Sequence, residues 1–162
     1  MLCWKPVFLA AFLLAAVPGS AQVEKVALRT TGISCGSCAP VAEMFLKRVN
    51  TVGKVFVDVE KEAILITLKP GAPFEPWDLR DAVERAEAGV VQIQISARGH
   101  AQDEGGKRYF IAGKDKFLLV ASPASKLPAG AAVTVEGIVN DRPDPMELKV
   151  LNVKPVKEAP KE

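Results

Sequence analysis

The stretch that decides the fold is Val52–Leu68, "VGKVFVDVEKEAILITL". Its first half has valine at every second position from residue 55 to residue 59, and its second half has Ile64, Ile66 and Leu68 with the same period. A period of two is typical of half-buried strands, and the polar "EKEA" between the two runs predicts a turn. The stretch therefore predicts a β-hairpin, and it excludes a parallel crossover at this point of the chain.

A helix is predicted on each side of the hairpin. Ala39–Val49 has apolar residues at helical spacing, and Pro40 falls in the first turn, where its missing N–H costs nothing. Pro76–Ala88 has a second such pattern, which we expect Gly89 to end. We expect Trp77 to be a packing residue. The predicted inward positions are Ala42, Phe45, Leu46 and Val49 in the first helix, and Leu79, Ala82, Val83 and Ala86 in the second.

Two further strands complete the first domain. Val23–Thr31 alternates before the first helix, and Val91–Ala97 alternates after the second. The resulting order is β-α-β-β-α-β, the ferredoxin-like arrangement of two helices on one antiparallel sheet. The sequence thus predicts an α+β fold, with this domain at residues 22–97.

The remainder of the chain has a different pattern. Short alternating runs such as "KFLLVAS" and "AAVTVEGIV" recur about every ten residues, separated by segments rich in Gly, Pro and Asp. There are four such runs, and together with a strand at Ile95–Ala101 they predict five strands. We expect a small all-β domain at residues 98–156, weakly resembling an OB-type barrel, and a disordered tail at residues 157–162. Whether Val91–Ala101 runs from one domain into the next stays open.

The N-terminus has the pattern of a secretory signal. Lys5 precedes the apolar run Val7–Val17, and small residues at Gly19 and Ala21 predict cleavage after Ala21. The run is shorter than the ~20 apolar residues that cross a bilayer. We therefore expect a secreted or periplasmic protein with no stable membrane span after cleavage of residues 1–21. A net charge of +2 gives no reason to expect nucleic acid as a partner.

Two of the three cysteines, Cys35 and Cys38, lie in "TGISCGSC" between the first strand and the first helix. A metal site, a redox pair and a local disulfide all fit this spacing. Adjacent thiolates at the start of a helix suit Cu(I), Hg(II) or Zn(II), which are soft or borderline ions. The chain's one histidine, His100, is distant in sequence, so a closed four-ligand zinc site within the chain does not fit.

The motif "TGISCGSC", followed by Ala42, Leu46, Val49, Val52 and Val55, resembles the heavy-metal-associated domain of copper chaperones, copper-transporting ATPases and mercuric-ion carriers. The resemblance covers residues 23–97. It implies that Cys35 and Cys38 are metal ligands, that copper(I) is the preferred ion over Hg(II) or Zn(II), and that a metal-transporting or metal-accepting protein is the partner. It also implies that Thr31, Gly32 and Ser34 shape the loop. Ile33 stands where the family has Met.

Two other functions remain open at this stage. The same pair could serve a thiol–disulfide oxidoreductase, although the hairpin after the first helix differs from the thioredoxin order. Alternatively, the protein could be a partner-binding module without metal. We find no Ser-His-Asp set and no paired-carboxylate motif, and we expect no enzyme. His100 and Met146 lie in the second domain and are left out of the site.

Overall fold

The computed structural model describes residues 20–120 and 127–156. The first part contains four strands and two helices: β1 (Gln22–Thr31), α1 (Cys38–Lys47), β2 (Val52–Asp58), β3 (Ala63–Leu68), α2 (Pro76–Glu84) and β4 (Gly89–Glu104). The second part adds four strands to β4: β5 (Lys107–Ala112), β6 (Asp115–Leu119), β7 (Val133–Asn140) and β8 (Glu147–Pro155). The predicted signal peptide, apart from Ser20 and Ala21, and the predicted tail lie outside the described residues.

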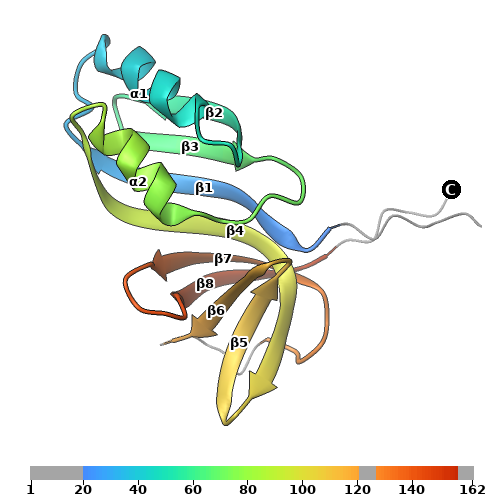
Figure 1. Cartoon of the computed structure of the whole chain (residues 1–162). Helices are drawn as coiled ribbons and strands as arrows, with labels where there is room; N and C mark the ends of the chain where they lie inside the picture. Colours follow the sequence, from blue (N-terminus) through green and yellow to red (C-terminus); the bar gives the residue numbers. More distant parts are fainter. Residues whose placement is uncertain (1–19, 121–126, 157–162) are drawn as a thin grey trace, which may run out of the picture.

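The first part has the predicted ferredoxin-like arrangement. Its strands lie in the order β2-β3-β1-β4, and every pairing among them is antiparallel. Both helices lie on one face of this sheet, and the other face carries no helix (Figure 1). Alternation explains the arrangement, because each strand turns one row of apolar side chains toward the helices. The largest fully buried side chains of this core are Leu28, Ile33, Leu46, Ile64, Ile66, Leu79, Ile93 and Ile95.

The second part is a closed ring of five strands. β4 pairs with β5, β5 with β6, β6 with β8, β8 with β7, and β7 again with β4. The pairing of β6 with β8 is parallel and the other four are antiparallel. Phe110, Phe117, Val135 and Leu148 fill the interior and are completely buried.

One strand, β4, belongs to both parts. It is 16 residues long, and it pairs with β1 up to Arg98 and with β5 from His100 onward. The change of partner takes place at Gly99, where a Cβ atom would lie 2.0 Å from the carbonyl oxygen of Ile111. Only glycine allows the strands to approach this closely. The predicted boundary between residues 97 and 98 therefore falls inside a continuous strand.

Two details of α2 differ from the prediction. The helix ends at Glu84, and the residue that ends it in the left-handed conformation is Glu87 (φ 59°), not Gly89. Ala88 N–H donates to Val83 O and Glu87 N–H donates to Glu84 O, which is the hydrogen-bond pattern of a Schellman motif. Trp77 is 62% exposed and is not a packing residue, because it projects from α2 on the side opposite to the buried Leu79 and Val83.

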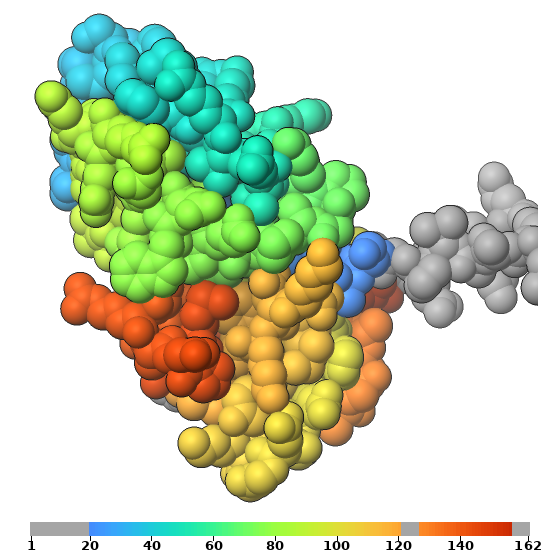
Figure 2. Space-filling model, in the orientation of Figure 1, coloured from blue at the N-terminus to red at the C-terminus, as the bar shows by residue number. Residues whose placement is uncertain are grey.

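Side chains join the two parts where α2 meets the ring. Arg80 on α2 forms an ion pair with Asp141 in the β7–β8 connection. The carboxylate of Asp115, at the start of β6, accepts the backbone N–H of Phe74 at 3.0 Å. The rings of Phe74 and Phe117 lie 6.0 Å apart between their centroids. Figure 2 shows the α2 region in direct contact with the β7–β8 connection.

Candidate metal centre

The loop between β1 and α1 carries both cysteines at one end of the sheet. Ile33 is 1% exposed and fixes the loop to the core beneath it, as expected for an apolar residue at this position. Cys35 is exposed, and Cys38 is half-buried as the first residue of α1. The backbone N–H groups of the first helical turn, which have no partner within the helix, therefore begin at the cysteine pair.

Cys35 and Cys38 are joined by a disulfide, with their Cα atoms 5.3 Å apart. Cys38 N–H donates to Cys35 O at 3.0 Å and closes a tight turn. The hydroxyl of Ser37 lies 3.2 Å from the sulfur of Cys35. Of the three states that the spacing allows, the structure contains the local disulfide. Because a disulfide sulfur is not a thiolate, the role of the pair as metal ligands remains a prediction for the reduced protein.

The connection between α2 and β4 supports the cysteine loop from one side. Gly32 has φ +88°, and a Cβ atom there would lie 3.2 Å from the carbonyl oxygen of Glu87. Thr31 lies beside Gly89, where a Cβ atom would be 3.0 Å from its hydroxyl. The loop thus enters α1 through a glycine that packs directly on the end of α2.

The turn of the β2–β3 hairpin supports the loop from the other side. Both the backbone N–H and the hydroxyl of Thr30 donate to the carbonyl oxygen of Glu62, at 2.8 Å and 2.9 Å. Thr30 is 4% exposed, so this double contact is protected from water. The end of β1 is therefore held between two other connections, which gives the cysteine pair a rigid base.

Within the part of the chain that the structure describes, no further metal ligands gather at this site. Among residues 20–120 and 127–156, no group of three or more His, Cys, Asp and Glu side chains could hold a metal ion. His100 lies on β4 opposite Ile111, and Met146 packs against the core. Met146 lies in the connection between β7 and β8, and its side chain is partly buried.

The exposed side of α1 near the cysteines is apolar. Val41 is 40% exposed and Met44 is 44% exposed, one turn of the helix apart. The first turn of α1 has no acidic residue. A partner that approaches the cysteine pair along this helix therefore meets apolar surface, with no carboxylate in the first turn to compete for a cation.

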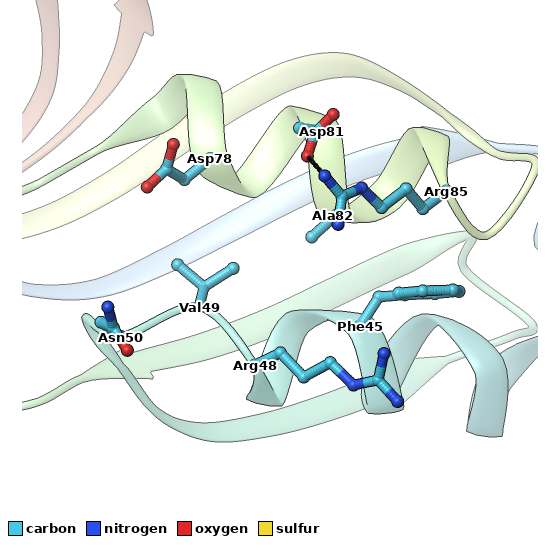
Figure 3. A pocket seen from close by; sticks show the side chains of 8 residues that line it. All are labelled: Phe45, Arg48, Val49, Asn50, Asp78, Asp81, Ala82 and Arg85. Atoms are coloured by element: carbon cyan, nitrogen blue, oxygen red, sulfur yellow. Dashed lines mark ion pairs between the residues drawn. The ribbon is translucent and has the colours of Figure 1, made fainter.

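A shallow groove of about 200 Å³ lies between the two helices and has no residue from the cysteine loop in its lining (Figure 3). Both of its arginines have partners: Arg85 pairs with Asp81 at 2.8 Å, and the guanidinium of Arg48 lies 5.5 Å from the ring centroid of Phe45. The groove does not contribute to the candidate metal centre.

Comparisons with known proteins place copper-binding domains among the similar structures. No protein-family model matches the chain, and no curated protein is significantly similar to it. A CopZ metallochaperone has 24% identity, covers 41% of this chain and 98% of its own length, and gives a TM-score of 0.39. A structure described as "Crosstalk between Cu(I) and Zn(II) homeostasis" has 28% identity over 41% and 94%, with a TM-score of 0.38. A copper-binding domain from HMA7, a P-type ATPase, has 26% identity over 42% and 93%, with a TM-score of 0.37.

Within the described residues, no helix has the length and hydrophobicity to cross a membrane.

Proposed function

We propose that the reduced protein binds a soft metal ion, with copper(I) preferred over Hg(II) and Zn(II), through the thiolates of Cys35 and Cys38. It transfers or buffers this ion outside the cytoplasm, and a metal-transporting or metal-accepting protein is its partner. The observation that carries the proposal is the position of the pair. Both side chains converge at the exposed N-terminal end of a helix, on a loop that Thr30 and Gly32 hold in place.

Electrostatics at this position favour thiolates. The N-terminal end of a helix carries a partial positive charge, which stabilises an adjacent anion by about 0.3–1 kcal/mol. Two soft thiolates without further protein ligands match Cu(I), which accepts low coordination numbers. The site is open, because the described residues provide no third ligand. An ion held by two sulfurs at the surface remains accessible to the thiolates of an acceptor.

Reduction of the disulfide must precede binding. A dithiol reductant transfers two electrons and two protons to the Cys35–Cys38 bond, and it becomes a disulfide itself. Binding of Cu(I) then releases the protons of the two thiols. The oxidation state of the pair therefore controls the proposed metal site.

The experiment is an anaerobic titration of the reduced protein with Cu(I) against a competing chelator. We expect one ion per chain, and none for the oxidised protein or for the C35S/C38S variant. Reduced protein that competes no better than this variant contradicts the proposal. A Gly36→Ala variant is the matched control, because it changes the same loop without removing a sulfur and its Cβ atom meets no atom within 4 Å.

A thiol–disulfide oxidoreductase is the second candidate, and the disulfide itself favours it. Cys35 is exposed, so the thiolate of a dithiol donor has access to its sulfur. The donor becomes a disulfide as the Cys35–Cys38 bond opens, and the reduced pair then reduces a substrate disulfide while the Cys35–Cys38 bond forms again. An insulin-reduction assay with a dithiol donor separates the two functions. Turnover supports the oxidoreductase, whereas tight Cu(I) binding without turnover supports the metal carrier and our proposal that the protein is not an enzyme.

The organisation around this function is also proposed. Residues 1–21 act as a cleaved signal, residues 22–97 as a heavy-metal-associated domain, and β4 to β8 as an OB-type barrel. The barrel is supported by the ring of five pairings, by the parallel pair β6–β8 and by a first strand, β4, that pairs with both β5 and β7. The mass of the exported protein tests the cleavage site, because cleavage after Ala21 leaves Gln22 at the N-terminus.

A further inference from the structure

β2 is a free sheet edge. Among the described strands it is the one that pairs on a single side, with β3. The strand at the opposite side of the first part, β4, pairs with β7, and β7 pairs in turn with β8. No other described strand therefore lies beside the outward N–H and C=O groups of β2. An edge of this kind pairs readily with another strand.

The side chains on the helix-free face of β2 form a self-complementary row. Its register with β3 places Lys54, Phe56 and Asp58 on this face, opposite Thr67, Leu65 and Ala63. Phe56 is 61% exposed and Leu65 is 50% exposed, so the face presents apolar surface at the edge. A positive charge lies two residues before Phe56, and a negative charge lies two residues after it.

We propose that two copies of this chain associate by antiparallel pairing of their β2 strands about a two-fold axis at Phe56. In this register residue 54 faces residue 58 of the second copy, and residue 56 faces residue 56. Each Lys54 then lies opposite an Asp58, twice in the dimer, and the two Phe56 rings meet at the axis. The result is one sheet that continues through both molecules.

Nothing on β2 prevents pairing over residues 54–58. The strand has no proline. The register shift at Gly53 disturbs the ladder before Lys54 and so limits the paired stretch to its C-terminal part. Asp58 pairs with Lys61 at 3.1 Å and accepts the Lys61 N–H at 3.1 Å. A carboxylate has about four lone-pair positions, so it also accepts a lysine from a second copy.

The dimer leaves both cysteine pairs accessible. β2 ends beside the β2–β3 turn, whose Glu62 accepts the hydrogen bonds of Thr30 next to the cysteine loop. Antiparallel pairing directs the two β2 strands oppositely, so the two Cys35–Cys38 pairs lie at opposite ends of the dimer. Association through β2 is therefore distinct from association through a shared metal ion.

The test is sedimentation equilibrium of the purified protein from micromolar to millimolar concentration, in the C35S/C38S background so that no metal or disulfide bridges two copies. We expect a reversible dimer. K54E places like charges opposite each other twice, and we expect it to raise the dissociation constant at least about tenfold. Lys25→Glu is the matched control: it makes the same charge change on an exposed residue of β1, away from the edge, and we expect it to leave the dimer intact.

A mixing experiment identifies the register. K54E and D58K each carry like charges in their own dimer, but a mixture of the two has opposite charges at both contacts. We expect the mixture to recover the dimer, and circular dichroism confirms that each variant is folded. F56D changes a mostly exposed residue and leaves Asp58 and its contacts with Lys61 in place. We expect this variant to be monomeric.

Two results overturn the proposal. One is a protein that stays monomeric at every concentration. This result overturns the proposal even if the β2 edge of the monomer pairs with a strand of a different protein. The other is a dimer whose dissociation constant is unchanged by both K54E and F56D.

Discussion

Arg80 and Asp141 form a two-point ion pair between α2 and the β7–β8 connection. The Nε and Nη2 groups of Arg80 donate to the two carboxylate oxygens of Asp141, at 2.6 Å and 2.8 Å, and Nη1 donates to Val90 O at 3.0 Å. The Asp141 side chain is 3% exposed and that of Arg80 is 24% exposed. The hydrogen bonds from Arg80 lower the pKa of Asp141 below its usual value. One arginine thus joins a helix of the first part, a strand shared by both parts and a connection of the ring.

Removal of this arginine is expected to destabilise the whole protein. Arg80→Ala leaves a buried carboxylate without its partner, and we expect a loss of about 2–4 kcal/mol in the free energy of unfolding. Arg85→Ala removes an exposed ion pair with Asp81 on the same helix and is expected to cost less than about 1 kcal/mol. Denaturant unfolding at pH 7 measures both losses, and equal losses contradict the importance of the junction.

The buried carboxylate of Asp115 predicts a pH dependence. Burial raises its pKa from 3.8 to about 6, against the lowering effect of the Phe74 N–H. The folded state therefore binds the proton more tightly than the unfolded state. The resulting contribution to stability is fully present below pH 3.8 and is lost as the pH rises through about 6, by up to about 3 kcal/mol. Asp115→Asn is expected to remove this slope, which unfolding between pH 4 and pH 7 measures.

Asp141 provides an opposite control for that experiment. Because its folded-state pKa is lowered, its contribution is present above the unfolded value near 3.8 and is lost as the pH falls further. The pH range in which Asp115 changes stability, between about 3.8 and 6, therefore lies above the range in which Asp141 does. A slope between pH 4 and pH 6 that persists in the Asp115→Asn variant contradicts the assignment to Asp115.

The two glycines of the cysteine loop, Gly32 and Gly36, are expected to differ in how well they tolerate substitution by alanine. Gly32→Ala forces a side chain into the left-handed region at φ +88° and toward Glu87 O, and we expect a loss of about 1–2 kcal/mol. Gly36 has no such conformation, and a Cβ atom there meets no atom within 4 Å. Gly36→Ala is therefore expected to stay within about 0.5 kcal/mol of the native protein. Thermal unfolding of the two variants checks this difference; an equal effect contradicts it.

The end of α2 offers a stabilising change. Glu87 occupies the left-handed position of the Schellman motif, where glycine has no Cβ penalty. We expect E87G to raise the free energy of unfolding by up to about 1 kcal/mol, after the entropy cost of glycine in the unfolded chain. E84G, three residues earlier and inside α2, is expected to lower it by about 1 kcal/mol. A loss in both variants contradicts the conformational explanation.

Local patterns predicted most of the first part. The alternation in Val52–Leu68 and the helical spacing of Leu79, Ala82 and Val83 depend on burial of one face, and the structure confirms both. The end of α2 was predicted less well, because Gly89 is a stronger signal for a left-handed residue than Glu87. The prediction that Trp77 is a packing residue was wrong for a related reason. A hydrophobic residue in a helix is buried only if it lies on the same face as the other buried residues, and residue 77 does not lie on the face of Leu79.

Contacts between segments distant in the sequence could not be predicted from local patterns. Arg80 and Asp141 are 61 residues apart, and Phe74 and Asp115 are 41 apart, with no repeat or motif that links them. The convergence of Cys35 and Cys38 was predictable, because three residues separate them. Their covalent state was not, because a CxxC spacing fits a thiolate pair and a disulfide equally.

The shared strand β4 has a consequence for how this protein evolves. Two units connected by a linker can be recombined, since a cut in the linker leaves each unit whole. Here no peptide bond between Gly89 and Glu104 can be cut without taking a strand from one sheet or the other. An exchange of either half with a related gene has to preserve the length and phase of one strand and the glycine at position 99. A change in the length or phase of β4 therefore affects both halves at once.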